Sequence, residues 1–169
     1  MADPRQRLIE QIPRLRRYAR ALLGDPAQAD ELVQETLARA LARLDRWERG
    51  TDLRAWLFTL MHHLQVDRWR RKQREAAALA QAPGTDSVPD AGPAAVEVGE
   101  LERALARLPE EQREVLLLVG LEGLAYRQVA EVLGIPQGTV MSRLHRAREA
   151  LRAALDGRRS GAVGMRRIK

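Results

Sequence analysis

Arginine, histidine and hydroxyl side chains gather near the C-terminal end of the sequence at a spacing that suits contact with DNA. The candidate contact residues are Thr139, Ser142, Arg143, His145 and Arg146. On a helix, the apolar Val140, Leu144, Ala147 and Leu151 share one face, which leaves Ser142, His145 and Arg146 opposite. Arginine can donate two parallel hydrogen bonds to guanine in the major groove, and hydroxyl groups bond phosphates or base edges. This stretch predicts a helix that contacts DNA.

The residues just before this helix are typical of a helix-turn-helix. In the segment 126–140, Val129, Ala130 and Leu133 form an apolar face, Gly134 occupies the tight turn, and Ile135 follows it. This spacing packs one helix against the base of the next and presents the second helix to a major groove. A solvated charged face on a helical hairpin is the plainer alternative, and the turn spacing disfavours it.

A second basic group lies in the N-terminal half. Arg68, Arg70, Arg71, Lys72 and Arg74 follow one another with no acidic residue among them. A cationic track of this kind can follow the sugar-phosphate backbone of a single strand.

Helices are the elements that must position both groups. Apolar residues recur at three- and four-residue spacing in a segment that ends near Gly24, in a helix that begins at about Pro26, and in a third that opens after Thr51 or Asp52. A linker rich in Ala, Pro and Gly follows at 76–95. Beyond it we expect helices at 96–108 and 109–121, then two shorter helical segments across Gly134 to Pro136. The prediction is an all-α chain with two small helical domains.

Composition agrees with a nucleic-acid partner. The 169 residues carry a net charge of +6, with a sequence pI near 10.8, and aromatic residues make up only 4%. The excess charge is uneven, at about +5 over residues 1–75 and about −1 over 96–155, so DNA binding in the second half must depend on where its arginines lie. No cysteine is present, which excludes disulfides and thiolate metal sites. The sequence predicts neither a signal peptide nor membrane insertion, and a cytoplasmic location is expected.

The C-terminal motifs resemble a known family. The segments 108–116 (LPEEQREVL), 123–126 (GLAY) and 138–148 (GTVMSRLHRAR) are similar to the region of RNA polymerase sigma factors that binds the −35 promoter element. The likeness is to the extracytoplasmic-function (ECF) group of the sigma-70 family. It implies a sigma region 2-like domain at 1–75, the linker at 76–95, a region 4-like domain at 96–157 and a basic tail at 158–169.

The N-terminal motifs carry the same resemblance. The segment 30–36 (DELVQET) is similar to the family's polymerase-binding helix, which implies that Glu31, Gln34 and Glu35 contact core RNA polymerase. The segments 53–59 and 66–72 resemble the part that opens the duplex and captures the −10 element. The residues that this likeness assigns to −10 binding and melting are Arg43, Trp47, His63, Arg68, Arg70 and Arg71, with Trp47 as a wall or stacking surface for an unstacked base.

Three residues depart from the family pattern. Ala125 stands where a helix-capping Ser is usual, Met141 where Lys or Arg is usual, and His63 where Asn is usual. The first weakens a helix cap by about 1 kcal/mol. The second removes a phosphate contact, and the third retains a hydrogen-bonding group in the base pocket.

The resemblance implies a specificity subunit that binds core RNA polymerase and promoter DNA and is controlled by an anti-sigma factor. It implies no enzymatic activity, no cofactor and no metal. A stand-alone helix-turn-helix regulator is the main alternative, although the alternating strands and helices of a receiver domain are missing. A helical protein-binding adaptor leaves the clustered arginines unexplained, and a metal-dependent hydrolase would rest on only two ligands, His63 and Asp67.

Overall fold

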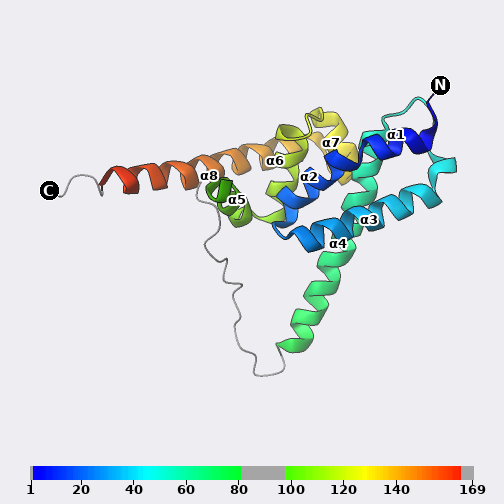
Figure 1. Ribbon diagram of the computed structural model, residues 1–169. Coiled ribbons are helices and arrows are strands. Elements are labelled where there is room, and N and C mark those ends of the chain that lie inside the picture. The colour runs from blue at the N-terminus through cyan, green and yellow to red at the C-terminus, as the bar shows by residue number, and fades with distance from the viewer. Residues whose placement is uncertain (1, 81–97, 165–169) are drawn as a thin grey trace.

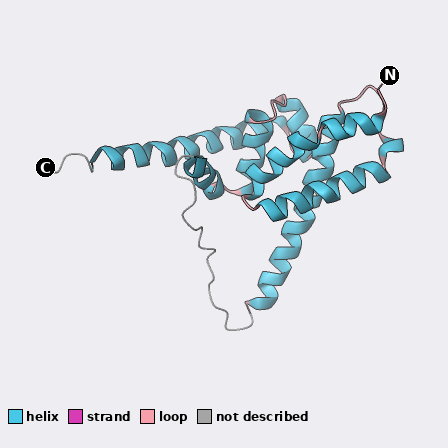
Figure 2. Ribbon diagram, viewed as in Figure 1, coloured by secondary structure: helices cyan, strands magenta, loops and turns pink. Residues whose placement is uncertain are grey.

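The computed structural model describes residues 2–80 and 98–164, and in these ranges every regular element is a helix. Figure 2 shows helices joined by short loops, which confirms the all-α prediction. None of the described helices is long and apolar enough to cross a membrane.

The first half, called the N-terminal module below, contains four α-helices and a short 3₁₀ turn. They are α1 (Pro4–Glu10), α2 (Ile12–Leu23), α3 (Pro26–Ala42), η1 (Leu44–Arg46) and α4 (Leu53–Leu79). The carboxylates of Asp25 and Asp52 accept hydrogen bonds from the first backbone amides of α3 and α4, which confirms both predicted starts. Gly24 ends α2 in the left-handed region at φ 71°. Helix α1 was not predicted, although Asp3 and Pro4 form the same cap signal as Asp25 and Pro26.

The second half, the C-terminal module, contains α5 (Val98–Arg107), α6 (Glu110–Gly120), α7 (Tyr126–Leu133) and α8 (Gln137–Gly164). Four helices were expected, but α8 is 28 residues long and continues past position 158, where a separate tail was predicted. Helix α4 likewise runs to Leu79, so the first residues assigned to the linker are helical. The rest of the linker lies outside the described residues.

The two modules pack against each other, which the sequence did not predict. Helix α2 contacts α5 and α6, and α4 contacts α7. One cluster of buried residues therefore includes Leu15 and Leu57 from the N-terminal module and Val115 and Val129 from the C-terminal module. Figure 1 shows α2 beside α6, with the C-terminal part of α4 extending away from the bundle. The C-terminal part of α4 is thus the segment of the N-terminal module that projects from the packed helices.

Candidate nucleic-acid interface

Helix α8 is anchored by its apolar face and exposes its polar face. Val140, Leu144 and Ala147 are buried in the core, while Ser142, His145 and Arg146 are exposed. The predicted division of this helix into two faces is confirmed. Three of the five candidate −35 contacts are therefore accessible on one surface.

The other two candidates are partly covered. Arg143 keeps 26% of its side chain exposed and its Nη2 lies 3.5 Å from Glu111 Oε2. Thr139 is half-buried, and its backbone carbonyl accepts a hydrogen bond from Ser142 Oγ at 3.1 Å. His145 Nε2 lies 3.3 Å from Glu149 Oε1, whereas Arg146 forms no ion pair within the described residues. Arg146 is thus the arginine of this group most available to a base edge.

The turn before α8 has the expected geometry with one weak point. Gly134 ends α7 at φ 64°, a left-handed conformation that glycine adopts without strain. At the start of α7, Gln128 Oε1 accepts a hydrogen bond from the Ala125 amide at 3.0 Å. Ala125 has no side-chain oxygen to cap the next turn, so only half of a capping box is present. The side-chain capping bond that a Ser would supply is therefore absent, and its effect on stability stays a prediction.

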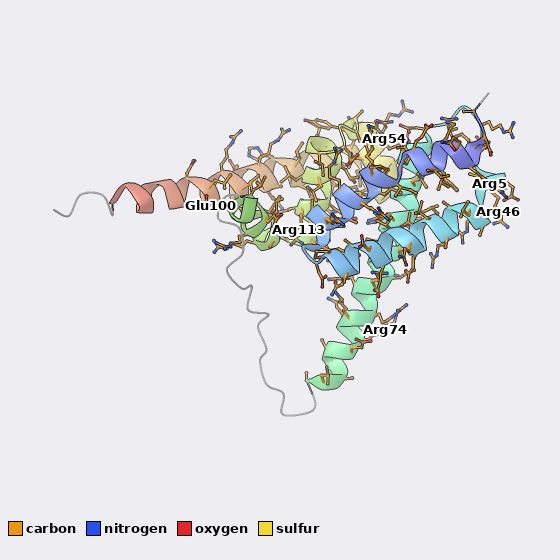
Figure 3. The ribbon with its side chains drawn as sticks, in the orientation of Figure 1. Arg5, Arg46, Arg54, Arg74, Glu100 and Arg113 are labelled. Carbon is orange, nitrogen blue, oxygen red and sulfur yellow. The ribbon has the colours of Figure 1, made fainter. Side chains whose placement is uncertain are left out.

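The basic track lies on the projecting part of α4. Arg70 and Arg71 are exposed, and Figure 3 shows Arg74 on the same segment, away from the bundle. Arg68 lies closer to the body and is half-buried, with its Nη2 3.3 Å from Glu35 Oε2 and its Nη1 3.4 Å from the Gln28 carbonyl. The outer arginines are therefore free to contact a nucleic-acid backbone, while Arg68 is already engaged.

The remaining −10 candidates do not form one surface. Arg43 and His63 are exposed, on the C-terminal end of α3 and on α4 respectively. Trp47 is only 5% exposed, and the guanidinium of Arg7 lies 5.1 Å from the centre of its ring. The expectation that Trp47 offers a stacking surface is wrong for this conformation, because the ring belongs to the core and α1 covers it. The sequence could not distinguish a core aromatic from an exposed one here.

The polar face of α3 is open. Glu31, Gln34 and Glu35 are exposed, while Leu32 and Val33 between them are buried. The face predicted to bind polymerase is therefore accessible, with Glu35 paired to Arg68. Across residues 2–80 and 98–164, no group of three His, Asp or Glu side chains is placed to hold a metal ion.

Polar residues between the modules were missed by sequence reasoning. The Glu122 side chain is fully buried, with Oε1 3.1 Å from Arg17 Nη2 and Oε2 3.9 Å from Arg14 Nε. Arg54 Nη1 donates to the Glu122 carbonyl at 3.0 Å. His62 Nδ1 lies 2.5 Å from Glu114 Oε1. The partners are far apart in sequence, so no local pattern could have revealed them.

Arg113 is the centre of a second set of contacts between the modules. Its guanidinium donates to the carbonyls of Leu105, Leu108 and Ala106 near the end of α5, and to that of Leu22 near the end of α2. Figure 3 shows it where these helices meet. Burial lowers the pKa of Arg113 from its usual value, and Glu110 opposes this shift. One side chain therefore donates hydrogen bonds to carbonyls at the ends of two helices.

Tyr18 lies in the same region. It is buried, and its ring packs edge-on against Phe58 with centroids 4.9 Å apart. Burial, with smaller contributions from Glu114, Glu122 and Glu110, raises the pKa of Tyr18 well above its usual value. All three carboxylates come from the C-terminal module, so the electrostatic surroundings of Tyr18 depend on the contact between the modules.

Comparison with known proteins agrees with this architecture. Residues 8–62 match the family described as the sigma2 domain of PhyR, and residues 99–151 match sigma-70 region 4. The ECF RNA polymerase sigma factor EcfG of Rhodopseudomonas palustris (strain TIE-1) is 40% identical over 159 residues, covering 89% of this chain and 84% of that protein. SigW of Bacillus subtilis (strain 168), also an ECF sigma factor, is 29% identical over 147 residues, covering 79% of each chain.

A solved structure extends the likeness to three dimensions. The sigma factor RpoE of Bartonella quintana, determined in complex with the anti-sigma factor NepR, has a TM-score of 0.77 and 32% identity, covering 90% of this chain and 96% of that one. The resemblance inferred from the motifs is thus confirmed along most of the sequence. The chain belongs to the ECF group of RNA polymerase sigma factors.

Proposed function

We propose that this ECF sigma factor binds core RNA polymerase through α3 and directs initiation by contacting the −35 and −10 promoter elements with α8 and α4. The observation that carries the proposal is the pairing, in one chain, of an exposed polar face on α3 with two separate arginine-bearing helices. A stand-alone DNA-binding regulator needs only one of these surfaces.

Each surface has its own role. Glu31, Gln34 and Glu35 dock on polymerase, and Ser142, His145 and Arg146 contact base edges in the −35 major groove, with Thr139 and Arg143 beside the phosphates. Residues of the N-terminal module hold the melted −10 strand: the arginines Arg43, Arg68, Arg70 and Arg71 by its phosphates, and His63 by a hydrogen bond to a base. The role is one of binding, with no catalytic step by this chain, and its place is the cytoplasm.

Control by an anti-sigma factor is part of the proposal. RpoE was solved with the anti-sigma factor NepR, and CnrH, with a TM-score of 0.67 and 27% identity, was solved with the cytosolic domain of CnrY. A groove of about 1010 Å³ between α2, α5, α6 and α8 offers apolar walls and a rim of arginines, including Arg16 and Arg20. An acidic amphipathic helix fits such a surface.

The test is a pull-down with core RNA polymerase followed by run-off transcription from a promoter library, with and without the protein. Binding to core and new transcription start sites are the expected results. Binding to duplex DNA without any affinity for polymerase would replace the proposal with a stand-alone regulator.

A further inference from the structure

Met141 is an apolar side chain on the polar face of α8. It is 52% exposed, whereas Val140 and Leu144 on the same helix are buried. Ser142 and His145, which lie beside Met141 on this face, are exposed as well. Isolated apolar residues are common on protein surfaces and need no function. The position of Met141 within α8 is what sets it apart.

Met141 lies at the end of α8 that a helix-turn-helix inserts into the major groove. Helix α8 begins at Gln137, so Met141 is its fifth residue. The N-terminal residues of such a helix are the ones that contact base edges. Met141 and His145 are four residues apart, so their side chains lie in one row along the helix. A duplex that His145 contacts is therefore within reach of Met141.

Gly138 leaves room for a close approach at this end of α8. Its backbone is helical with no positive φ, and within the described part of the chain a Cβ atom there would meet nothing within 4 Å beyond the adjacent backbone. Glycine is less favourable than alanine in a helix, so neither conformation nor packing accounts for it here. Because Gly138 precedes Met141 by three residues, the missing side chain lets DNA come close to the helix beside Met141.

The chemistry of the methionine side chain limits what it can recognise. It has no hydrogen-bond donor and its sulfur is a weak acceptor, so it cannot read the polar pattern of a base pair. The apolar group that bases present in the major groove is the C5-methyl of thymine. The thioether is flexible and polarisable, and it adapts its shape to an apolar partner. Met141 is therefore suited to a thymine and unsuited to a phosphate.

We propose that Met141 determines part of the −35 specificity by contacting the C5-methyl group of a thymine. The contact selects thymine at one position of the element, on either strand, and adds to the selection made by hydrogen bonds from Arg146. This inference rests on the proposed function, which places α8 in the major groove of the −35 element.

Deoxyuridine supplies the test, because it pairs as thymidine does and lacks the C5-methyl group. Each thymine of the −35 element is replaced in turn, and binding of the reconstituted holoenzyme to each promoter duplex is titrated. The proteins compared are the wild type, Met141→Ala and Met141→Lys. Ile9→Ala is the matched control, since Ile9 is an apolar side chain of α1 with a similar exposure of 55%. Circular dichroism verifies that each variant is folded.

We expect the wild type and Ile9→Ala to lose about fourfold in affinity at one thymine position, which is the effect of burying one methyl group. Met141→Ala and Met141→Lys should bind the thymine and uracil duplexes equally at that position. Uracil also changes base stacking, but this effect is common to all four proteins and cancels in the comparison. An equal loss in all four proteins would overturn the assignment, as would a −35 element in which no thymine shows a loss with the wild type.

A failure of the proposed function would be recognised separately. If the chain does not bind core RNA polymerase, the same titrations use a duplex selected by the full chain alone, and the methyl effect there decides the role of Met141. If the chain binds neither core nor any duplex, both the proposed function and this inference are wrong.

Discussion

Replacing Arg113 by Met should lower the free energy of unfolding. Met keeps an apolar side chain of similar length but cannot donate any of the hydrogen bonds that Arg113 makes. Arg113 makes hydrogen bonds of 2.8 Å to Leu105, 2.7 Å to Leu22 and 2.8 Å to Leu108, all partly buried. A hydrogen bond contributes about 1 kcal/mol net where the separated groups regain water, so three give about 3 kcal/mol. The exposed bond to Ala106 is left out of this sum.

Urea unfolding followed by far-UV circular dichroism measures this loss. The free energy of unfolding of Arg113→Lys should lie between those of the wild type and Arg113→Met, because an ammonium group keeps the charge but cannot reach carbonyls on two helices at once. Arg107→Met is the control, since Arg107 is exposed at the end of α5 and forms no hydrogen bond or ion pair within the described residues. A loss under about 1 kcal/mol for Arg113→Met, equal to that of an ordinary surface change, would refute the role assigned to Arg113.

Three further predictions concern other parts of the molecule. Arg146→Ala should weaken binding to a −35 duplex by about 1 to 3 kcal/mol and relax its base preference, whereas Arg152→Ala, exposed further along α8, should preserve selectivity in the same titration. Ala125→Ser should raise the free energy of unfolding by about 1 kcal/mol, since a hydroxyl would complete the cap of α7; an unchanged urea midpoint would contradict this. The raised pKa of Tyr18 means that the unfolded chain ionises its phenol first, so stability is fully present below the usual pKa of 10.0 and falls as pH rises above it. In Tyr18→Phe the free energy of unfolding should therefore fall less above pH 10. If it falls equally with pH in the wild type and in Tyr18→Phe, ionisation of Tyr18 is not the cause.

Local rules predicted the helices well because their signals lie within a few residues. Asp25 and Asp52 cap helices with their own carboxylates, and Gly24 and Gly134 end helices where a left-handed residue is needed. The division of α8 into two faces followed from apolar spacing alone. These features need no knowledge of the rest of the chain.

Long-range packing explains the failures. Glu122 stands in a turn near two glycines, a place where a carboxylate is usually solvated, yet it is buried and pairs with Arg17, 105 residues away. Trp47 was assigned to a DNA surface, but its ring is buried, and Arg7 of α1, an unpredicted helix, lies over it. Neither result could follow from sequence spacing, because each depends on contact between elements that are distant along the chain.

Helix α4 joins a buried half to an exposed half without a break. Leu57 and Phe58 fix its rotation against the core, and the same 27-residue helix then carries Arg70 and Arg71 into solvent. Each residue of an α-helix turns the chain by about 100° and advances it by about 1.5 Å. One residue inserted after Gln65 would therefore aim the whole cationic track at a different side of the molecule, whereas four would return it to within about 40°. An insertion changes the direction of every arginine at once, whereas a substitution changes only one side chain. The number of residues between Phe58 and Arg70 therefore determines where the basic track faces.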